Sequence, residues 1–183
     1  MFVKLPELML IPLRDFVPLI ISIYLSLNLS GQDARSFIKT EFKGYNKQKV
    51  LDTLLKASET FAEDIPDTSL VLGEIAYEMV NKGNDYKSSA LAARRIAEAY
   101  FYKNEYRLAI DYYMKSAAAE YLNSSDSTGF LAERLTDAAY CYQELGIYEK
   151  ALELNTISLR INLKLGNTSE IGNNLCNMDF GCN

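Results

Sequence analysis

Histidine and tryptophan are both absent from this chain of 183 residues. Histidine is the commonest general base and transition-metal ligand in proteins, so its absence argues against most catalytic triads and imidazole-based metal sites. Three cysteines occur, Cys141, Cys176 and Cys182, and none of them has the close paired spacing of a zinc site. We interpret them as one buried thiol and two thiols near the C-terminus. We therefore expect neither a metal nor a cofactor.

Proline is scarce and unevenly placed. Pro6, Pro12 and Pro18 lie close together near the N-terminus, and the fourth proline is Pro66. Beyond Asp67 no proline interrupts the chain, as a continuous series of helices requires. Hydrophobic residues make up 49% of the chain and charged residues 23%, which is typical of a folded protein. The composition therefore favours an ordered, helical chain.

The sequence also lacks any cluster of basic residues. Lysine and arginine are interspersed with aspartate and glutamate, and the formal net charge is -5. A chain of this kind has no positive surface that would gather phosphate groups. We expect no nucleic-acid partner.

The N-terminal segment 1–31 has the features of a signal peptide. An apolar run from Phe16 to Leu29 follows two basic residues and ends in the small residues Ser30 and Gly31. The run is short for a membrane span, which needs about 20 residues, although an uncleaved N-terminal anchor stays open. We expect an exported, periplasmic or membrane-tethered protein with the rest of the chain outside the cytoplasm. N-terminal sequencing after cell fractionation tests this expectation.

Small and aromatic residues recur at a distance of 42 positions. The first copy contains Ala97, Tyr100, Tyr106, Ala109 and Ser116, and the second contains Ala139, Tyr142, Tyr148, Ala151 and Ser158. A weaker copy, slightly closer in the sequence, precedes the first and contains Ala57, Ser69 and Ala76. A fixed period of roughly 40 residues is typical of stacked structural repeats.

The apolar spacing within each copy is helical, so the sequence predicts an all-α fold, an α-solenoid of antiparallel helical hairpins. Residues 50–168 are predicted to form about three hairpins, with turns near Pro66, Asn104 and Gly146. A linker or frayed helix is expected at 32–49. Residues 169–183 are expected to form the first helix of an incomplete fourth repeat.

These residues resemble the tetratricopeptide-repeat (TPR) family, in its longer-period variety with an extended second helix. The family has a small and an aromatic residue on the first helix, often glycine in the turn, and alternating aromatic and small residues on the second. One repeat fills this pattern with Ala97, Tyr100, Tyr106, Ala109, Tyr113 and Ser116, and the next with Ala139, Tyr142, Gly146, Tyr148, Ala151 and Ser158. The resemblance covers roughly residues 50–183. It implies that the small residues lie where helices cross and that the aromatic residues fill the space beside them.

Three positions depart from the family pattern. Asn155 occupies the second aromatic position, where we expect it to be partly exposed, and Asn104 replaces the turn glycine. In the fourth repeat Asp179 falls at the small position, which would place its carboxylate at a helix crossing. The sequence also ends before a second helix of that repeat, so we expect the chain to be incomplete as a functional unit.

The resemblance implies a concave groove lined by the first helix of each hairpin, and a protein or peptide as its partner. Candidate groove residues flank Ala97 and Ala139: Arg94, Glu98, Phe101, Tyr102, Thr136, Tyr140, Gln143 and Glu144. Family members that bind a C-terminal carboxylate have lysine and asparagine at the positions of Arg94 and Glu98. Because Glu98 would repel a carboxylate, we do not expect this ligand here.

The chain also resembles, more loosely, the extracytoplasmic TPR sensor regions of bacterial two-component histidine kinases. It would then be the N-terminal fragment of a larger signal-transduction protein, and the membrane would be reached only through the leader or through a missing C-terminal span. The open reading frame beyond Asn183 distinguishes this alternative from an independent scaffold. An enzyme is not expected, because the carboxylates on the predicted helix surfaces have no partner base and residues 124–127 read as a linker.

Overall fold

The computed structural model describes residues 35, 36, 38, 40, 44–81, 83–124 and 128–179, and it contains no strand among them. The predicted leader at 1–31 lies outside the described residues, as do Phe180 and Cys182. Helices follow one another along the described chain: α3 (Lys47–Phe61), α4 (Pro66–Val80), α5 (Tyr86–Tyr102), α6 (Tyr106–Ser124), α7 (Gly129–Glu144), α8 (Tyr148–Leu165) and α9 (Thr168–Met178).

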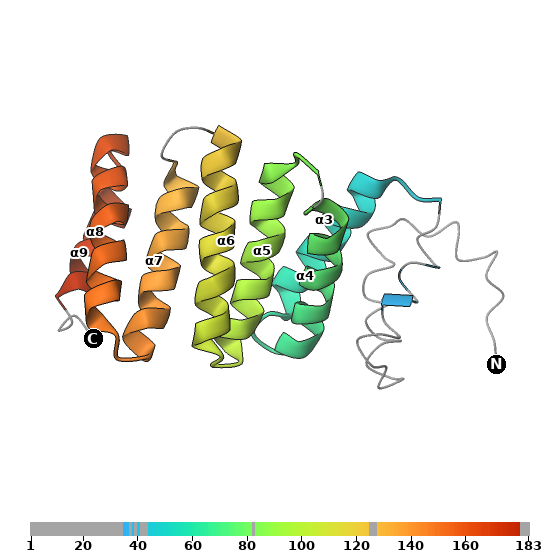
Figure 1. The fold of residues 1–183 in the computed structure, drawn as a ribbon, viewed down its shortest axis with the longest axis horizontal. Coiled ribbons are helices and arrows are strands. Elements are labelled where there is room, and N and C mark those ends of the chain that lie inside the picture. The colour runs from blue at the N-terminus through green and yellow to red at the C-terminus, as the bar shows by residue number, and fades with distance from the viewer. Residues whose placement is uncertain are drawn as a thin grey trace.

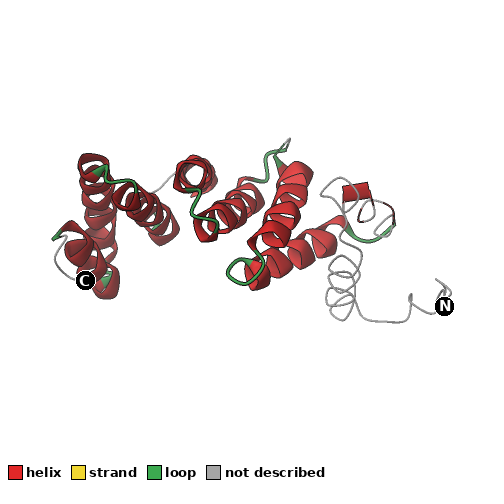
Figure 2. Cartoon of the chain, turned by 90° about the horizontal axis from the view of Figure 1, so that it is seen from below, coloured by secondary structure: helices red, strands yellow, loops and turns green. Residues whose placement is uncertain are grey.

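The helices stand side by side in the order of the sequence (Figure 1). Each packs against the next, and α3 also contacts α5. Seen from below, the row runs from α3 and α4 at one end to α8 and α9 at the other (Figure 2). The pairs α3/α4, α5/α6 and α7/α8 are the three hairpins, and α9 follows them. The prediction of an all-α solenoid of antiparallel hairpins is confirmed.

The turns within the hairpins lie where the sequence predicts them. Pro66 is the first residue of α4, a position where its missing N–H costs no helical hydrogen bond. Asn104 and Gly146 occupy equivalent turn positions in successive repeats, and both are left-handed, with φ of 58° and 71°. Asparagine and glycine are the residues that tolerate this conformation best, which explains how asparagine replaces the turn glycine.

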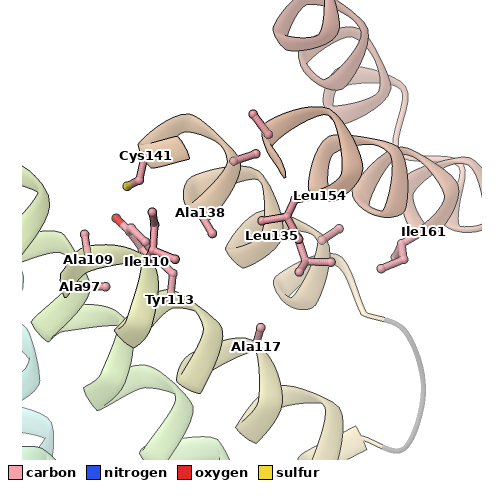
Figure 3. Packing of buried hydrophobic residues seen from close by; sticks show 13 residues of the cluster. Ala97, Ala109, Ile110, Tyr113, Ala117, Leu135, Ala138, Cys141, Leu154 and Ile161 are labelled. Atoms are coloured by element: carbon pink, nitrogen blue, oxygen red, sulfur yellow. The ribbon is translucent and has the colours of Figure 1, made fainter. Parts of the chain in front are cut away.

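Alanines fill the crossings between helices. Ala97, Ala109, Ala139 and Ala151 are fully buried and belong to one cluster that extends from α5 to α8 (Figure 3). A second cluster joins α3 and α4 and includes Ala92 of α5. Each hairpin therefore shares its core with the next, as stacked repeats require.

Serine hydroxyls repeat the same contact in successive hairpins. Ser116 of α6 donates to the carbonyl of Ala90 at 2.7 Å, and Ser158 of α8 donates to the carbonyl of Ala132 at 2.9 Å. Both serines are buried. The two serines are one full repeat apart in the sequence, and so are the two residues whose carbonyls accept. The serines of the repeat thus hold the second helix of a hairpin against its first.

Aromatic residues of the repeat are less uniform. Tyr113 is buried, and Tyr100, Tyr106 and Tyr142 are partly buried against the cluster. Tyr148, in contrast, is 56% exposed.

The neighbours of the two corresponding tyrosines explain this difference. Tyr106 packs against the ring of Phe101 and donates its hydroxyl to Asn104 Oδ1 at 2.8 Å. At the equivalent positions of the next repeat, Gln143 has no aromatic ring and Gly146 has no side chain.

Asn155 is fully buried, and both atoms of its amide group lack a hydrogen-bond partner. The prediction that it is partly exposed is wrong. The same repeat position holds Tyr113 in the preceding hairpin and Gly73 in the first. A Cβ on Gly73 would lie 3.1 Å from Ile96 Cγ1 and 3.3 Å from the backbone nitrogen of Ile96. This position therefore faces the first helix of the next hairpin, which buries whatever side chain stands there.

Helix α9 packs against α8 through a polar contact. Asn174 is buried, and its amide accepts from Asn162 Nδ2 at 2.9 Å and donates to Ser158 Oγ at 3.1 Å. The helix ends at Met178, and Asp179 beyond it is exposed. The prediction that Asp179 lies at a helix crossing is wrong, because the helix stops one residue before it.

The predicted linker contributes to α3. Its helix begins at Lys47, three residues before the predicted limit, and the side chain of Asn46 caps it by accepting from Lys49 N at 3.1 Å. Arg35 forms an ion pair with Glu74 of α4. None of the helices within the described residues is long and apolar enough to cross a membrane.

Candidate functional site

A cavity of about 370 Å³ lies across the first helices of the three hairpins. We call it the groove cavity. Its lining comes from α3 and the residue that caps it, from α5 and α7, and from one tyrosine of α6: Glu59, Ala62, Arg94, Arg95, Glu98, Phe101, Tyr102, Tyr113, Asp137 and Tyr140.

The structure brings most of the predicted groove residues of α5 and α7 together in this cavity. Arg94, Glu98, Phe101 and Tyr102 line it from α5, and Tyr140 lines it from α7. They share a surface because residues three or four positions apart lie on one face of a helix.

The other predicted residues of α7 do not line the cavity. Thr136 Oγ1 accepts from Asn174 Nδ2 at 3.0 Å, and Gln143 Nε2 donates to the carbonyl of Asn177 at 2.6 Å. Both side chains therefore contact α9. Glu144 is exposed, and its charge, followed by burial, raises the pKa of Tyr140 above its ordinary value.

Besides Glu59, two charged residues of the cavity, Arg95 and Asp137, were not among the predicted groove residues. They are separated by one full repeat and so occupy the same position in successive hairpins. The repeat period could have identified them, since each directly follows a predicted groove position, Arg94 or Thr136. Tyr113 was assigned to packing alone, and it both packs and lines the cavity.

The two arginines of α5 each bind two carboxylates. Arg94 lies 2.6 Å from Glu98 and 3.4 Å from Glu133 of α7. Arg95 lies 2.7 Å from Glu98 and 2.7 Å from Glu59 of α3. Burial opposes the charge of Arg94, but Glu98 and Glu133 outweigh it and raise the pKa of the guanidinium. These ion pairs connect three successive first helices.

A third arginine extends this network along α7. Arg134 is buried, and its Nη2 lies 2.5 Å from Glu133 Oε1 and 3.4 Å from Asp137 Oδ2. The complete network has three guanidinium groups and four carboxylates: Arg94, Arg95, Arg134, Glu59, Glu98, Glu133 and Asp137.

Aromatic rings form the other wall of the cavity. Phe101 meets Tyr102 edge to face at 5.5 Å between ring centroids, and it meets Tyr140 of α7 at 5.6 Å. Tyr102 and Tyr140 are both exposed. Exposed aromatic side chains next to charged groups are typical of a binding surface.

Burial raises the pKa of Asp137 to about 6, from an ordinary value of 3.8. Arg134 and Arg94 oppose this rise, whereas Glu133 and Glu98 add to it. The side chain is still 34% exposed, so solvent reduces the effect of burial on stability. Asp137 therefore changes its charge in a range where most carboxylates are already ionised.

We expect the contribution of Asp137 to the stability of the protein to fall as the pH rises from about 4 to about 6. In this range the folded state binds a proton at Asp137 that the unfolded state has lost, so raising the pH favours unfolding. Asp137→Asn removes this contribution. Urea unfolding across this range should show the wild type losing stability relative to the variant, and parallel curves would contradict the assignment.

The described residues contain no group of three or more His, Cys, Asp or Glu side chains arranged to hold a metal ion. Cys141 is buried, and burial followed by the charge of Asp137 raises the pKa of its thiol to about 12. A thiol in this state is a poor nucleophile.

The structure is similar to that of the TPR domain of FLU from Arabidopsis, with a TM-score of 0.57 and 28% sequence identity. The similarity covers 63% of this chain and 96% of that one. No protein-family model matches the sequence, and no curated protein matches it.

Proposed function

We propose that this TPR-like α-solenoid is a non-catalytic scaffold that binds a segment of another protein in the groove cavity. The TPR fold favours protein partners. The observation that carries the proposal is the cavity itself, where exposed aromatic rings adjoin a network of ion pairs across three successive first helices.

The cavity has the composition of an interface centre. Aromatic and arginine side chains are the commonest sources of binding energy at protein interfaces. Here Arg94 and Arg95 are held by ion pairs, and Phe101 packs against three other rings. Because these side chains are already ordered, a partner loses little affinity to ordering them.

The TPR fold is typically a scaffold without catalytic activity. We extend this to the present chain, because its cavity is lined by arginines, carboxylates and aromatic rings and by no serine, threonine or cysteine side chain. We also propose that the protein is exported, which rests on the sequence of residues 1–31 alone.

Site-specific photocrosslinking tests the scaffold function. A benzophenone amino acid replaces Tyr102, at the cavity, or Tyr121, an exposed tyrosine of α6 outside the cavity. We expect a crosslinked partner from the first position and not from the second, and we expect Phe101→Ala to abolish it. Equal crosslinking at both positions, or none at Tyr102, would contradict the proposal.

A further inference from the structure

Building on the proposed scaffold function, we propose that the bound protein segment inserts a lysine or arginine side chain into the groove cavity. The cation would lie against the rings of Phe101, Tyr102 and Tyr140 and pair with the carboxylate of Asp137. This identifies the partner as a basic segment, which the scaffold function alone does not.

The charge balance of the ion-pair network supports a cationic guest. Its three guanidinium groups face four carboxylates, so one negative charge remains uncompensated. Asp137 has the weakest ion pair of the four carboxylates. Its nearest guanidinium nitrogen is Arg134 Nη2, which lies 3.4 Å from Asp137 Oδ2 but 2.5 Å from Glu133 Oε1. A further cation at Asp137 would neutralise the network.

The aromatic wall favours the same guest. Cations bind to the faces of aromatic rings at about 6 Å or less from the ring centroid. Phe101, Tyr102 and Tyr140 line the cavity with their rings inclined to one another, at 84° for Phe101 and Tyr102 and at 55° for Phe101 and Tyr140. Inclined rings around one space offer a cation several surfaces at once.

The carboxylates and the rings alternate along the two helices. Asp137 lies one turn before Tyr140 on α7, and Glu98 lies one turn before Phe101 on α5. A side chain that enters between α5 and α7 therefore meets rings on both helices and the carboxylate of Asp137, since Glu98 is already paired with Arg94 and Arg95. An anionic guest would meet these carboxylates instead, in a chain whose net charge is already -5.

The inference also predicts how binding depends on pH. The charged and titratable groups that face Asp137 are Arg134, Glu133 and Cys141 on its own helix, Arg94 and Glu98 on α5, and Tyr113 on α6. Since the pKa of Asp137 is raised to about 6, its carboxylate is largely neutral below that pH. Affinity for a cationic guest should therefore rise as the pH increases through this value.

Four pools of short peptides test the inference. Each pool is acetylated and amidated at its ends, is randomised at the flanking positions, and carries arginine, lysine, leucine or glutamate at the centre. We expect fluorescence anisotropy at neutral pH to show the arginine and lysine pools binding about tenfold more tightly than the glutamate and leucine pools, which corresponds to about 1.4 kcal/mol. This preference should shrink below pH 6.

Matched variants locate the guest. Asp137→Asn mimics the neutral acid and should remove both the preference and its pH dependence, and Tyr140→Leu should weaken binding of the cationic pools. Asp111→Asn and Tyr121→Leu, exposed on α6 outside the cavity, should change neither. Thermal melting confirms that each variant is folded.

The remaining outcomes separate this inference from the scaffold function. If the leucine or glutamate pool binds as well as the arginine pool, the cationic guest is excluded while the scaffold function stands. The same holds if no pool binds but a partner still crosslinks at Tyr102. If no pool binds and nothing crosslinks, the scaffold function fails as well.

Discussion

Ala109→Leu is expected to lower the free energy of unfolding by about 1–3 kcal/mol, because a larger side chain overpacks a filled core. Ala109 is fully buried in the cluster that extends from α5 to α8. Leucine at this crossing must push the helices apart or adopt a strained rotamer. Urea unfolding followed by circular dichroism measures the loss.

Ala118→Leu provides the control for this variant. Ala118 lies on the same helix, α6, but is exposed. Leucine and alanine have similar helix propensities, so this change should leave stability nearly unaltered. Equal stability of both variants and the wild type would show that Ala109 does not lie at a close crossing.

Asn155→Leu is expected to raise the free energy of unfolding by about 1–3 kcal/mol, the usual cost of a buried polar group without a partner. Both amide atoms of Asn155 lack hydrogen bonds, and the side chain is fully buried. Leucine has the same number and branching of side-chain heavy atoms, so it replaces the amide with little change of shape. The midpoint of urea unfolding should move to a higher concentration.

The same substitution at Asn174 should have the opposite effect. Asn174 is equally buried, but its amide bonds with Asn162, Ser158 and Thr136. Asn174→Leu removes these three buried hydrogen bonds and should destabilise the protein by about 1–3 kcal/mol. If both leucine variants shift stability in the same direction, hydrogen bonding does not decide the outcome.

The repeat period predicts the hairpins well because it records contacts that every hairpin makes. Ala109 and Ala151 lie at equivalent crossings, and Ser116 and Ser158 make equivalent hydrogen bonds. Such contacts depend on residue size and on backbone groups. They can therefore be predicted from spacing without knowing the neighbouring hairpin.

Contacts between hairpins are harder to predict, because the neighbour differs at each step. Thr136 and Arg94 occupy the same repeat position. Thr136 forms a hydrogen bond with an asparagine of α9, whereas Arg94 forms an ion pair with a glutamate of α7. Likewise, the exposure of Tyr148 depends on Gln143 and Gly146, whose side chains differ from those at the equivalent positions of the preceding repeat. The predicted groove residues of α5 thus line one cavity, whereas which residues of α7 join them could be seen only in the structure.

The links between successive first helices differ in chemistry along the array. Glu59 to Arg95 and Arg94 to Glu133 are ionic, and both glutamates are more than a third exposed, whereas Asn174 to Thr136 and Gln143 to Asn177 are neutral hydrogen bonds. Dissolved ions screen exposed charges over about 10 Å at 0.1 M salt and about 3 Å at 1 M salt, and they leave neutral bonds largely unaffected. We therefore expect concentrated salt to loosen the spacing of α3, α5 and α7 more than that of α7 and α9.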